Sequence, residues 1–296
     1  MNSTCTLCPR NCGVNRLNGE TGFCGQTNEL KAARAALHMW EEPCISGTEG
    51  SGTVFFSGCT LRCVYCQNFS IAAGKNGKII STERLSEIFL ELQNQGANNI
   101  NLVTPTHFVP QIASALTSAK KQGLKLPIVY NTGSYEHVET LRRMEGLVDI
   151  YLPDLKYFSS ELSLRYSHAK DYFEVASKAI AEMVRQVGTP IFDNRDMMTR
   201  GVIVRHLVLP GHTKDSKKIM EYLYQTYGNQ IYISIMNQFT PLSTLKDYPE
   251  LNRKLTKKEY DSVVDFCLSL GVENGFIQEG RTAVESFIPD FNCTGI

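Results

Sequence analysis

The sequence predicts an α/β fold: an incomplete, TIM-type (β/α)6 barrel with a cysteine-rich N-terminal extension. Three observations support this prediction. Short β-rich apolar runs alternate with helical patterns between residues 51 and 270, eight of the ten cysteines lie before residue 67, and notable polar side chains follow the predicted strands. Alternating strands and helices form parallel sheets with right-handed crossovers. Six such units fit an incomplete barrel, and a chain of 296 residues can form it as one domain.

Six segments are predicted as strands because each is short, mostly apolar and rich in β-branched or aromatic residues. Such composition is typical of strands that are buried on both faces of a sheet. The six are Thr53–Phe56, Ile100–Val103, Ile128–Tyr130, Ile150–Leu152, Val202–Leu209 and Ile231–Met236.

Helical patterns occupy the intervals between these strands. The first begins at Thr82, and its apolar residues recur along one stripe of the helix. Thr256 and Glu259 form a capping box, which opens a last helix that runs to Leu270 and ends at Gly271. The helices between these two are predicted over Val109–Lys121, Ser134–Met144, Tyr172–Val187 and Ser216–Tyr227.

Two regions follow from this pattern. Residues 1–50 are predicted to form a cysteine-rich metal-binding segment, and residues 51–296 the partial barrel with a C-terminal tail. Active sites of parallel α/β barrels lie at the carboxyl ends of their strands. Because the notable polar residues follow the predicted strands, we expect the active site there.

The overall charge is balanced, with 30 Lys and Arg against 30 Asp and Glu and a sequence pI of about 7.0. Such a balance gives no electrostatic reason to expect nucleic acid or a membrane surface as a partner. The N-terminus has no basic region followed by an apolar core, and no apolar run approaches the ~20 residues of a membrane span. We therefore expect a soluble, cytoplasmic protein, in which clustered cysteines bind metal or take part in catalysis.

The most informative motif is the loop after the first strand, with Cys59, Cys63 and Cys66 within eight residues. A [4Fe–4S] cluster normally takes four thiolates, so three leave one iron open to bind and activate a ligand. That is the arrangement needed to cleave S-adenosylmethionine by one-electron reduction. The alternative is a zinc site completed by a remote residue, but zinc sites usually add a second short cysteine pair, and none follows Cys66.

The segment from Gly58 to Asn68 resembles the cysteine loop of the radical S-adenosylmethionine (radical SAM) superfamily, most closely the pyruvate formate-lyase activating enzyme branch. Asp154-Leu-Lys156 and the run from Arg205 to Gly211 are similar to further motifs of that branch. Within it, the chain is most similar to uncharacterised homologues that carry an extra N-terminal cysteine segment.

The resemblance implies a [4Fe–4S] cluster and S-adenosylmethionine as cofactors, and reductive cleavage to a 5′-deoxyadenosyl radical. That radical would abstract hydrogen from a protein or peptide, such as the glycine of a glycyl-radical enzyme. An external one-electron reductant such as flavodoxin or ferredoxin would be a partner. The alternatives are a small metabolite or another protein residue as the target and, in a different class, a non-catalytic iron–sulfur electron-transfer protein.

The resemblance also assigns cofactor contacts. Lys156 would contact S-adenosylmethionine, and Arg205 would bind its methionine carboxylate. Asp154 would help to bind a monovalent cation, with Asn131 and Thr132 at the positions of further cation ligands. Because Asp154 and Lys156 alternate along a strand end they point the same way, so a mutual ion pair is the alternative.

Two further contacts are expected in the same cavity. Tyr65 could pack a flat ring face near the adenine. The family's Gly-Gly-Glu motif is absent, and residues 101–107 stand in its place, where Thr104, Thr106 and His107 could form hydrogen bonds without supplying the Glu charge.

A second cysteine group comprises Cys5, Cys8, Cys12 and Cys24. Four thiols can close a coordination shell, so this group is expected to bind zinc or an auxiliary [4Fe–4S] cluster. Such a segment has few apolar residues, and bound metal could supply much of its folding energy.

Three further cysteines and six polar residues are also candidates. Cys44 could join either site or be buried, Cys267 is expected in the core, and Cys293 has no obvious partner. His206 and His212 are expected to be hydrogen-bonded structural residues rather than catalysts, and Asn237 and Gln238 could line the cavity. Glu279 and Arg281 could close the open side of the barrel or meet the substrate, with an exposed salt bridge as the alternative.

Overall fold

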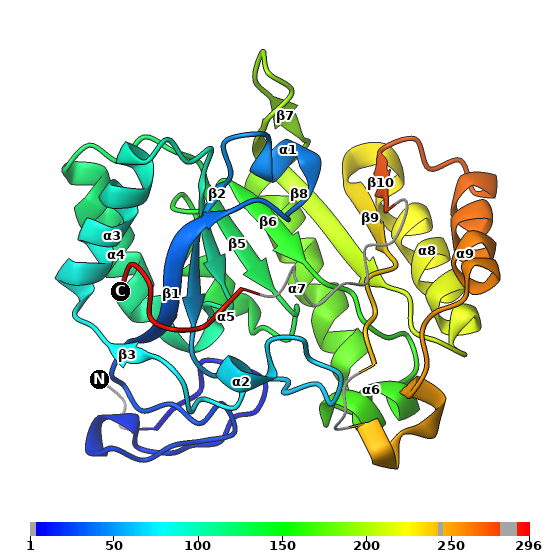
Figure 1. Cartoon of the computed structure of the whole chain (residues 1–296), viewed down its shortest axis with the longest axis horizontal. Coiled ribbons are helices and arrows are strands. Elements are labelled where there is room, and N and C mark those ends of the chain that lie inside the picture. The colour runs from blue at the N-terminus through cyan, green and yellow to red at the C-terminus, as the bar shows by residue number, and fades with distance from the viewer. Residues whose placement is uncertain (1–3, 242–244, 279–288) are drawn as a thin grey trace.

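A computed structural model describes residues 4–241, 245–278 and 289–296 of the chain. One open sheet forms its centre, with helices packed on the convex side and at the two flanks (Figure 1). The strands of the described residues are β1 (Lys31–His38), β2 (Ser51–Phe56), β3 (Lys78–Ile79), β4 (Ile100–Val103), β5 (Ile128–Thr132), β6 (Ile150–Pro153), β7 (Ile191–Phe192), β8 (Met198–Leu207), β9 (Tyr232–Met236) and β10 (Gly275–Ile277).

The strand order is β10-β9-β8-β6-β5-β4-β2-β1-β3, and β7 pairs with β8. Neighbours from β2 to β10 run parallel along this order, whereas β1 is antiparallel to both β2 and β3. All six predicted strands are present in the parallel part, and the two edge strands do not pair with each other in the described order. The predicted open α/β barrel is therefore confirmed.

The helices occupy the predicted intervals. They are α1 (Pro43–Ser46), α2 (Phe69–Ala72), α3 (Thr82–Asn94), α4 (Val109–Lys121), α5 (Val138–Arg142), α6 (Ser160–Ser167), α7 (Tyr172–Val187), α8 (Thr213–Tyr227) and α9 (Lys257–Ser269). The capping box of Thr256 and Glu259 is present at the start of α9. The helix predicted over Ser134–Met144 spans only Val138–Arg142, because Ser134 has a φ of 65° and His137, the residue before the helix, is in the extended region. Sequence analysis also missed α6 and the short helices α1 and α2.

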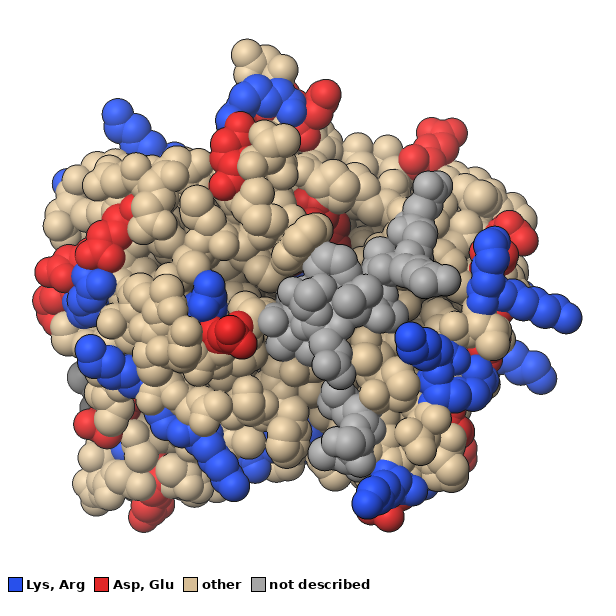
Figure 2. All heavy atoms as spheres, viewed as in Figure 1, with Lys and Arg blue, Asp and Glu red and all other residues tan. Residues whose placement is uncertain are grey.

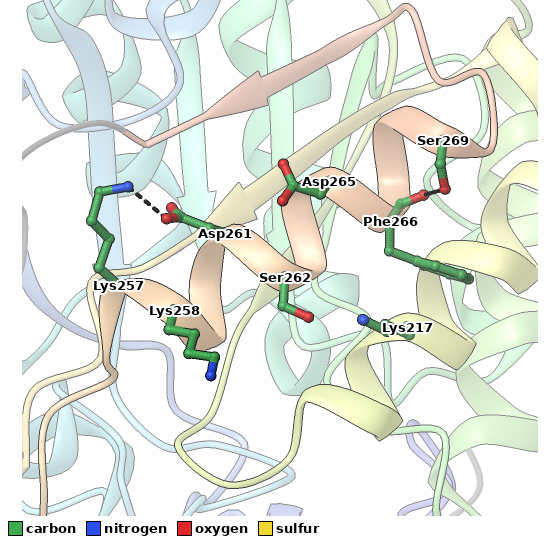
Figure 3. A pocket seen from close by; sticks show the side chains of 8 residues that line it. All are labelled: Lys217, Lys257, Lys258, Asp261, Ser262, Asp265, Phe266 and Ser269. Carbon is green, nitrogen blue, oxygen red and sulfur yellow. Dashed lines mark hydrogen bonds and ion pairs between the residues drawn. The ribbon is translucent and has the colours of Figure 1, made fainter.

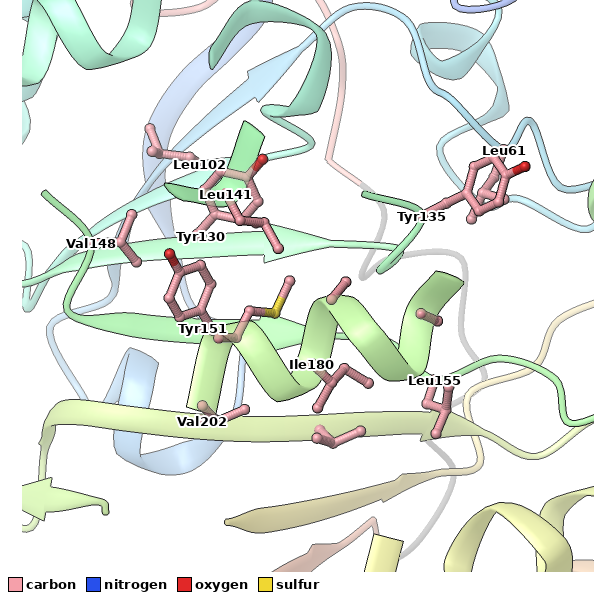
Figure 4. Packing of buried hydrophobic residues seen from close by; sticks show 14 of the residues in the cluster. Leu61, Leu102, Tyr130, Tyr135, Leu141, Val148, Tyr151, Leu155, Ile180 and Val202 are labelled. Atoms are coloured by element: carbon pink, nitrogen blue, oxygen red, sulfur yellow. The ribbon is translucent and has the colours of Figure 1, made fainter. Parts of the chain in front are cut away.

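The core lies between the convex face of the sheet and the helices. Tyr130 and Tyr151 from neighbouring strands pack with their ring centroids 5.6 Å apart, and Ile180 of α7 packs in the same cluster (Figure 4). All three side chains are fully buried. Both tyrosine hydroxyl groups form hydrogen bonds. Tyr151 donates to Gln186 at 2.6 Å and Tyr130 donates to Glu136 at 3.4 Å.

Strand β1 is the main element that sequence analysis did not predict. Its sequence contains four alanines, which favour helix, so local propensity opposes a strand here. Tertiary pairing decides otherwise: β2 pairs along one side of β1, and the C-terminal tail pairs along the other. The tail contacts are Ala35 N to Thr294 O at 2.8 Å and Cys293 N to Ala33 O at 2.9 Å. Residues 31–38, in the predicted N-terminal segment, are thus part of the sheet.

Two global features bear on partners. None of the described helices is long and apolar enough to cross a membrane. On the face shown in Figure 2, acidic and basic side chains are interspersed over the described surface, in keeping with the formal net charge of zero.

Candidate active site at the carboxyl ends of the strands

A cavity of about 240 Å³ lies at the carboxyl ends of the parallel strands. It brings together segments that are far apart in the sequence: the cysteine loop after β2, the ends of β4, β5, β6 and β8, and the chain that follows β1. The sequence-predicted residues that line it are Cys59, Cys63, Tyr65, Cys66, Thr104, Asn131, Thr132, Asp154, Lys156, Arg205 and Gln238. Tertiary structure therefore joins nearly all of the predicted contacts in one place.

The cysteine loop is held by its own backbone and by helix α6. Cys66 N donates to Cys63 O at 3.1 Å, and Val64 N donates to Tyr166 O at 2.9 Å. Ser167 at the end of α6 donates its hydroxyl hydrogen to Cys63 Sγ at 2.9 Å. Gly58, which starts the loop, has a φ of +92°, a conformation that favours glycine.

The thiols lie in a desolvated setting with a cation nearby. Burial raises the pKa of Cys63 and of Cys66, and the positive charge of Lys156 opposes this rise at both. Burial by itself would lower the pKa of Lys156, but Asp154 and Cys63 outweigh it and raise that pKa. A fixed cation beside the Cys63 and Cys66 thiols favours their deprotonated, metal-binding form.

Four charged side chains form an alternating row across the floor of the cavity. Lys156 Nζ lies 2.6 Å from Asp154 Oδ2, and Asp154 Oδ1 accepts a hydrogen bond from Arg205 Nε at 2.9 Å. Arg205 Nη1 donates to Glu41 Oε2 at 2.9 Å. Burial alone would raise the pKa of Asp154, but Arg205 and Lys156 outweigh it and hold that pKa low. The mutual ion pair of Asp154 and Lys156 is therefore present within a larger array.

An aromatic cluster surrounds Tyr65, which lines the cysteine end of the cavity. Tyr65 is buried, and edge contacts with Tyr157, Tyr166 and Phe239 surround it at centroid distances of 6.0 to 6.5 Å. Its hydroxyl lies 2.6 Å from that of Tyr157. The predicted packing of its ring against an adenine stays a prediction, because the structure shows Tyr65 lining the cavity within an aromatic cluster whose other three rings are not among the lining residues.

The two threonines expected in place of the Gly-Gly-Glu motif point to different places. Thr104 lines the cavity, whereas Thr106 is fully buried outside its lining and donates to Glu136 Oε1 at 2.6 Å. Thr132 donates to the same oxygen at 2.5 Å. Thr106 thus holds a buried carboxylate in this structure, which leaves Thr104 as the threonine that faces the cofactor cavity.

The family model described as the radical SAM superfamily matches residues 53–223, which is more than half of the chain. The chain belongs to the radical SAM superfamily. Membership implies that it uses a [4Fe–4S] cluster and S-adenosylmethionine.

Other radical SAM proteins and one uncharacterised relative show how far the similarity extends. An uncharacterised protein of Methanocaldococcus jannaschii is 29% identical over 273 residues, covering 89% of this chain and 74% of that one. SuiB of Streptococcus suis bound to its precursor peptide SuiA has a TM-score of 0.52 at 11% identity over 75% of this chain, which spans only 46% of SuiB. Methylornithine synthase has a TM-score of 0.51 at 15% identity, over 80% of this chain and 68% of that one. These two structures share the fold.

The residues present fit the radical SAM cluster. Three thiols line one cavity, two of them are desolvated, and a lysine balances their charge. Within the described ranges, no three His, Cys, Asp or Glu side chains are arranged to hold a single metal ion. A [4Fe–4S] cluster distributes its thiolates over separate iron atoms, so its ligands need to line one cavity rather than converge on one point.

The N-terminal cysteines lie within electrostatic reach of one another, since Cys24 interacts with Cys5, Cys8 and Cys12. Burial is the main reason that the pKa of Cys8 is raised to about 12, and the nearby thiols of Cys24 and Cys5 contribute to this rise. Cys12 Sγ lies where a side chain on Gly22 would project, since an added Cβ there would be 2.3 Å from the sulfur. All four cysteines are free thiols.

This segment docks directly on the radical SAM loop. Arg10 Nε donates to Thr60 O at 2.8 Å, inside the cysteine motif, and Arg10 Nη2 donates to Ser167 O at 2.9 Å. The guanidinium groups of Arg10 and Arg62 lie over the Phe23 ring at 3.9 and 5.3 Å from its centroid. The N-terminal segment and the catalytic loop are therefore one packed unit.

The histidines have structural partners. His107 is buried with Nε2 2.6 Å from Ser57 O, and His206 bridges Leu155 O and Ser216 Oγ. His212 lies 2.9 Å from the Tyr166 hydroxyl. None of the three is among the residues that line the cavity.

The remaining candidates divide between the core and the cavity edge. Cys44 and Cys267 are buried in hydrophobic clusters, as expected for the latter. Cys293 donates its backbone N–H to β1, and Asn237 bonds Gln278 through its backbone and side-chain nitrogens. Glu279 and Arg281 lie outside the described residues.

Sequence reasoning missed Glu41, a cavity-lining residue from the chain after β1. The adjacent acidic pair Glu41-Glu42 before Pro43 was its only local signal, and an acidic pair in a loop is usually solvated. Its approach to Arg205 depends on tertiary structure.

A larger hollow of about 670 Å³ lies between α8 and α9, and its chemistry differs (Figure 3). Asp261, Asp265 and Phe266 of α9 line it, and Lys217 of α8 lies 5.5 Å from the Phe266 ring centroid. Lys257 pairs with Asp261 at 2.5 Å, one turn away on the same helix. No cysteine lines this hollow, so size alone does not identify the active site.

Proposed function

We propose that this protein is a radical SAM enzyme that binds its cluster at Cys59, Cys63 and Cys66 and abstracts hydrogen from a protein or peptide. The observation that carries the proposal is the single cavity shared by the three thiols and by Asp154, Lys156 and Arg205. A non-catalytic electron-transfer protein would not need a charged row beside its cluster.

When bound, the cluster would pass one electron from an external reductant to S-adenosylmethionine, giving methionine and a 5′-deoxyadenosyl radical that takes a hydrogen atom from the substrate. The products are 5′-deoxyadenosine and a substrate radical, so atoms and electrons balance. Flavodoxin or ferredoxin is the class of reductant we propose.

The chain's own residues would bind and orient the cofactor. Lys156 lies at the cysteine end of the charged row and would pair with the methionine carboxylate. The Tyr65 ring lines the cysteine end of the cavity and would help to exclude water there, which would protect a reactive radical from side reactions. Thr104 offers a hydroxyl at the place of the missing Gly-Gly-Glu motif.

A protein or peptide substrate is favoured by two features. The motifs around Asp154 and Arg205 resemble those of activating enzymes, and the sheet is open between its two edge strands, which would give an extended chain lateral access. Activation of a glycyl-radical enzyme is the specific form of this proposal. The second candidate is a small metabolite, which a cavity of about 240 Å³ could also accommodate in part.

Anaerobic reconstitution with iron, sulfide, dithionite and S-adenosylmethionine tests the chemistry. We expect 5′-deoxyadenosine from the wild type and none above background from Cys63→Ala, with Cys267→Ala as a control because Cys267 is a core cysteine away from the cavity. Cleavage that survives in Cys63→Ala would contradict the placement of the cluster. Deuterium transfer from a glycine-deuterated peptide into 5′-deoxyadenosine would support the peptide substrate, whereas no transfer from any peptide would favour a metabolite.

The N-terminal group of Cys5, Cys8, Cys12 and Cys24 is proposed as a second, closed metal site for zinc or a [4Fe–4S] cluster. Support comes from four free thiols in a segment where the described residues 4–30 form one regular element, the 3-10 turn Arg16–Asn18. Zinc analysis and Mössbauer spectra of a variant lacking Cys59, Cys63 and Cys66 would identify the metal. Neither zinc nor iron in that variant would rule out the second site.

Ten free thiols suit a reducing compartment, so we propose a cytoplasmic location. Fractionation with a compartment marker would test it.

A further inference from the structure

The floor of the cavity contains a closed set of contacts around one guanidinium, here named the Arg205 cluster: Glu41, Asn131, Asp154, Lys156 and Arg205. Each of the three guanidinium nitrogens donates to a different oxygen. Nε bonds Asp154 Oδ1 at 2.9 Å, Nη1 bonds Glu41 Oε2 at 2.9 Å, and Nη2 bonds Asn131 Oδ1 at 2.6 Å. Asn131 Nδ2 also donates to Glu41 Oε1 at 3.3 Å, which closes a ring of contacts.

Glu41 is delivered to this place by two fixed elements. Strand β1 pairs with β2 up to His38, and Cys44 and Ile45 of α1 are buried in a hydrophobic cluster with residues of β5, β6 and β8. Between these anchors, Glu41 N donates to Ser46 Oγ at 3.0 Å. The carboxylate therefore reaches the barrel interior from the N-terminal extension and is not a mobile surface group.

The oxygens around Arg205 are of the kind that hard cations prefer. Two carboxylates and one amide carbonyl converge, and such oxygens are the usual protein ligands of hard metal ions. Asp154 and Asn131 are the positions at which the family resemblance implies a monovalent cation. Here the guanidinium takes one oxygen from each of them and a third from Glu41.

A tethered guanidinium differs physically from an ion captured from solution. Its occupancy does not depend on the salt concentration, whereas a bound ion fills its site only by mass action. Arginine stays protonated, and its planar donors match several oxygens at once. These contacts are also shielded from solvent ions, because the side chains are nearly buried. Their exposed fractions are 13% for Arg205, 9% for Glu41 and 16% for Asp154.

We propose that Arg205, held by Glu41 and Asn131, is a built-in cation that replaces a monovalent metal ion beside S-adenosylmethionine, so that cofactor binding is independent of sodium and potassium. Glu41 and Asn131 act as positioning residues in this arrangement. The inference rests on the proposed placement of the cofactor in this cavity.

The test measures S-adenosylmethionine affinity by calorimetry on the cluster-replete enzyme in choline, sodium and potassium chloride at equal ionic strength. We expect affinities that agree within about twofold, since solvent cations have no site to fill. In Arg205→Gln we expect affinity in choline to fall by about tenfold or more, because charge-assisted contacts are lost, and to recover in potassium, which can enter the vacated oxygens. Glu41→Gln should weaken binding less than Arg205→Gln and without a gain of potassium dependence, since Arg205 keeps its other two contacts.

Arg200→Gln is the matched control, because Arg200 lies on the same strand and donates to the backbone carbonyls of Val187 and Gln186 outside the cavity. If the wild-type affinity rises about tenfold or more in potassium or sodium, the inference is wrong but the proposed function is unaffected. The same holds if Arg205→Gln binds as tightly as the wild type in choline. Absence of binding in every salt would overturn the proposed function as well. If Arg205→Gln does not fold, Arg205→Lys and the wild-type salt series still decide.

Discussion

Arg10 Nε of the N-terminal segment donates to the carbonyl oxygen of Thr60, inside the cysteine motif, at 2.8 Å. The same guanidinium donates to Ser167 O and His168 O, which fastens the end of α6 to both segments. One side chain therefore links the second cysteine group, the catalytic loop and the helix whose Ser167 contacts Cys63. The integrity of the cluster site should depend on it.

Arg10→Ala is expected to lower the free energy of unfolding by about 2 kcal/mol, since several backbone carbonyls lose a charged donor. It should also reduce the iron retained per chain after reconstitution. Arg200→Ala is a matched control. Arg200 also donates to two backbone carbonyls, but these belong to Val187 and Gln186 and not to the cysteine loop. Urea unfolding and iron analysis measure both quantities. Equal iron content in the two variants would show that docking by Arg10 does not support the cluster.

Gly58→Ala should disrupt the contact between the catalytic loop and the N-terminal segment. An added Cβ would lie 2.7 Å from Cys24 O and 2.6 Å from Gln26 Cγ. Gly123→Ala provides the control, because Gly123 has a similar φ of +106° against +92° but open space around it. Strain in the left-handed region lowers the free energy of unfolding by about 1–2 kcal/mol at either position. A larger decrease for Gly58→Ala than for Gly123→Ala therefore measures the steric clash. Equal losses in thermal or urea unfolding would contradict the close docking seen here.

Ser167→Ala should lower the reduction potential of the proposed cluster. Its hydroxyl donates to Cys63 Sγ at 2.9 Å, and hydrogen bonds to cluster sulfurs help to set the potential by stabilising the reduced, more negative state. Ser163→Ala in the same helix is the control, because its hydroxyl donates only to the backbone of Ser160. An EPR-monitored redox titration checks both variants. An unchanged or higher potential in Ser167→Ala would argue against Cys63 as a cluster ligand.

Glu136 should make the protein less stable as the pH rises from about 4.5 to about 7. Burial raises its pKa from 4.5 to about 7, although Thr106, Thr132 and Tyr130 oppose the rise through hydrogen bonds. Over this window the folded state binds more protons than the unfolded state, so the free energy of unfolding falls by about 3 kcal/mol from this group. Glu136→Gln should remove that slope.

Urea unfolding at a series of pH values, for wild type and Glu136→Gln, measures the difference. Glu174→Gln serves as the control, because Glu174 is a surface residue paired with Lys178 one turn along α7. A wild-type slope that persists in Glu136→Gln would assign the pH dependence to another group.

Much of the fold could be predicted from local sequence. Helices α4 and α7 have the predicted bounds, and the capping box of Thr256 and Glu259 is formed, because periodicity and capping depend on residues within one or two turns. The predicted strand Ile100–Val103 also matches β4. The helix predicted from Ser134 was wrong at its start, because the backbone leaves the helical region at Ser134 and is still extended at His137.

The residues of the cavity could be predicted only where a sequence motif lies at the end of a predicted strand. Cys59, Asp154 and Arg205 follow or end strands, so a parallel sheet places them at one edge. Thr106 follows β4 in the same way, yet its side chain turns to Glu136. The direction of a side chain after a strand depends on the loop's path, which local patterns do not encode.

The sequence by itself determined the cysteine loop, the alternation of strands and helices, and membership of the radical SAM superfamily, because these reside in short motifs and in periodicities of a few residues. Only the tertiary structure decided that the alanine-rich segment after the N-terminal cysteines becomes β1 and that Glu41 meets Arg205, 164 residues away. The physical reason is the same in both cases. Pairing of β1 with β2 and burial of α1 outweigh local propensity, and contacts between distant residues are fixed by the path of the whole chain.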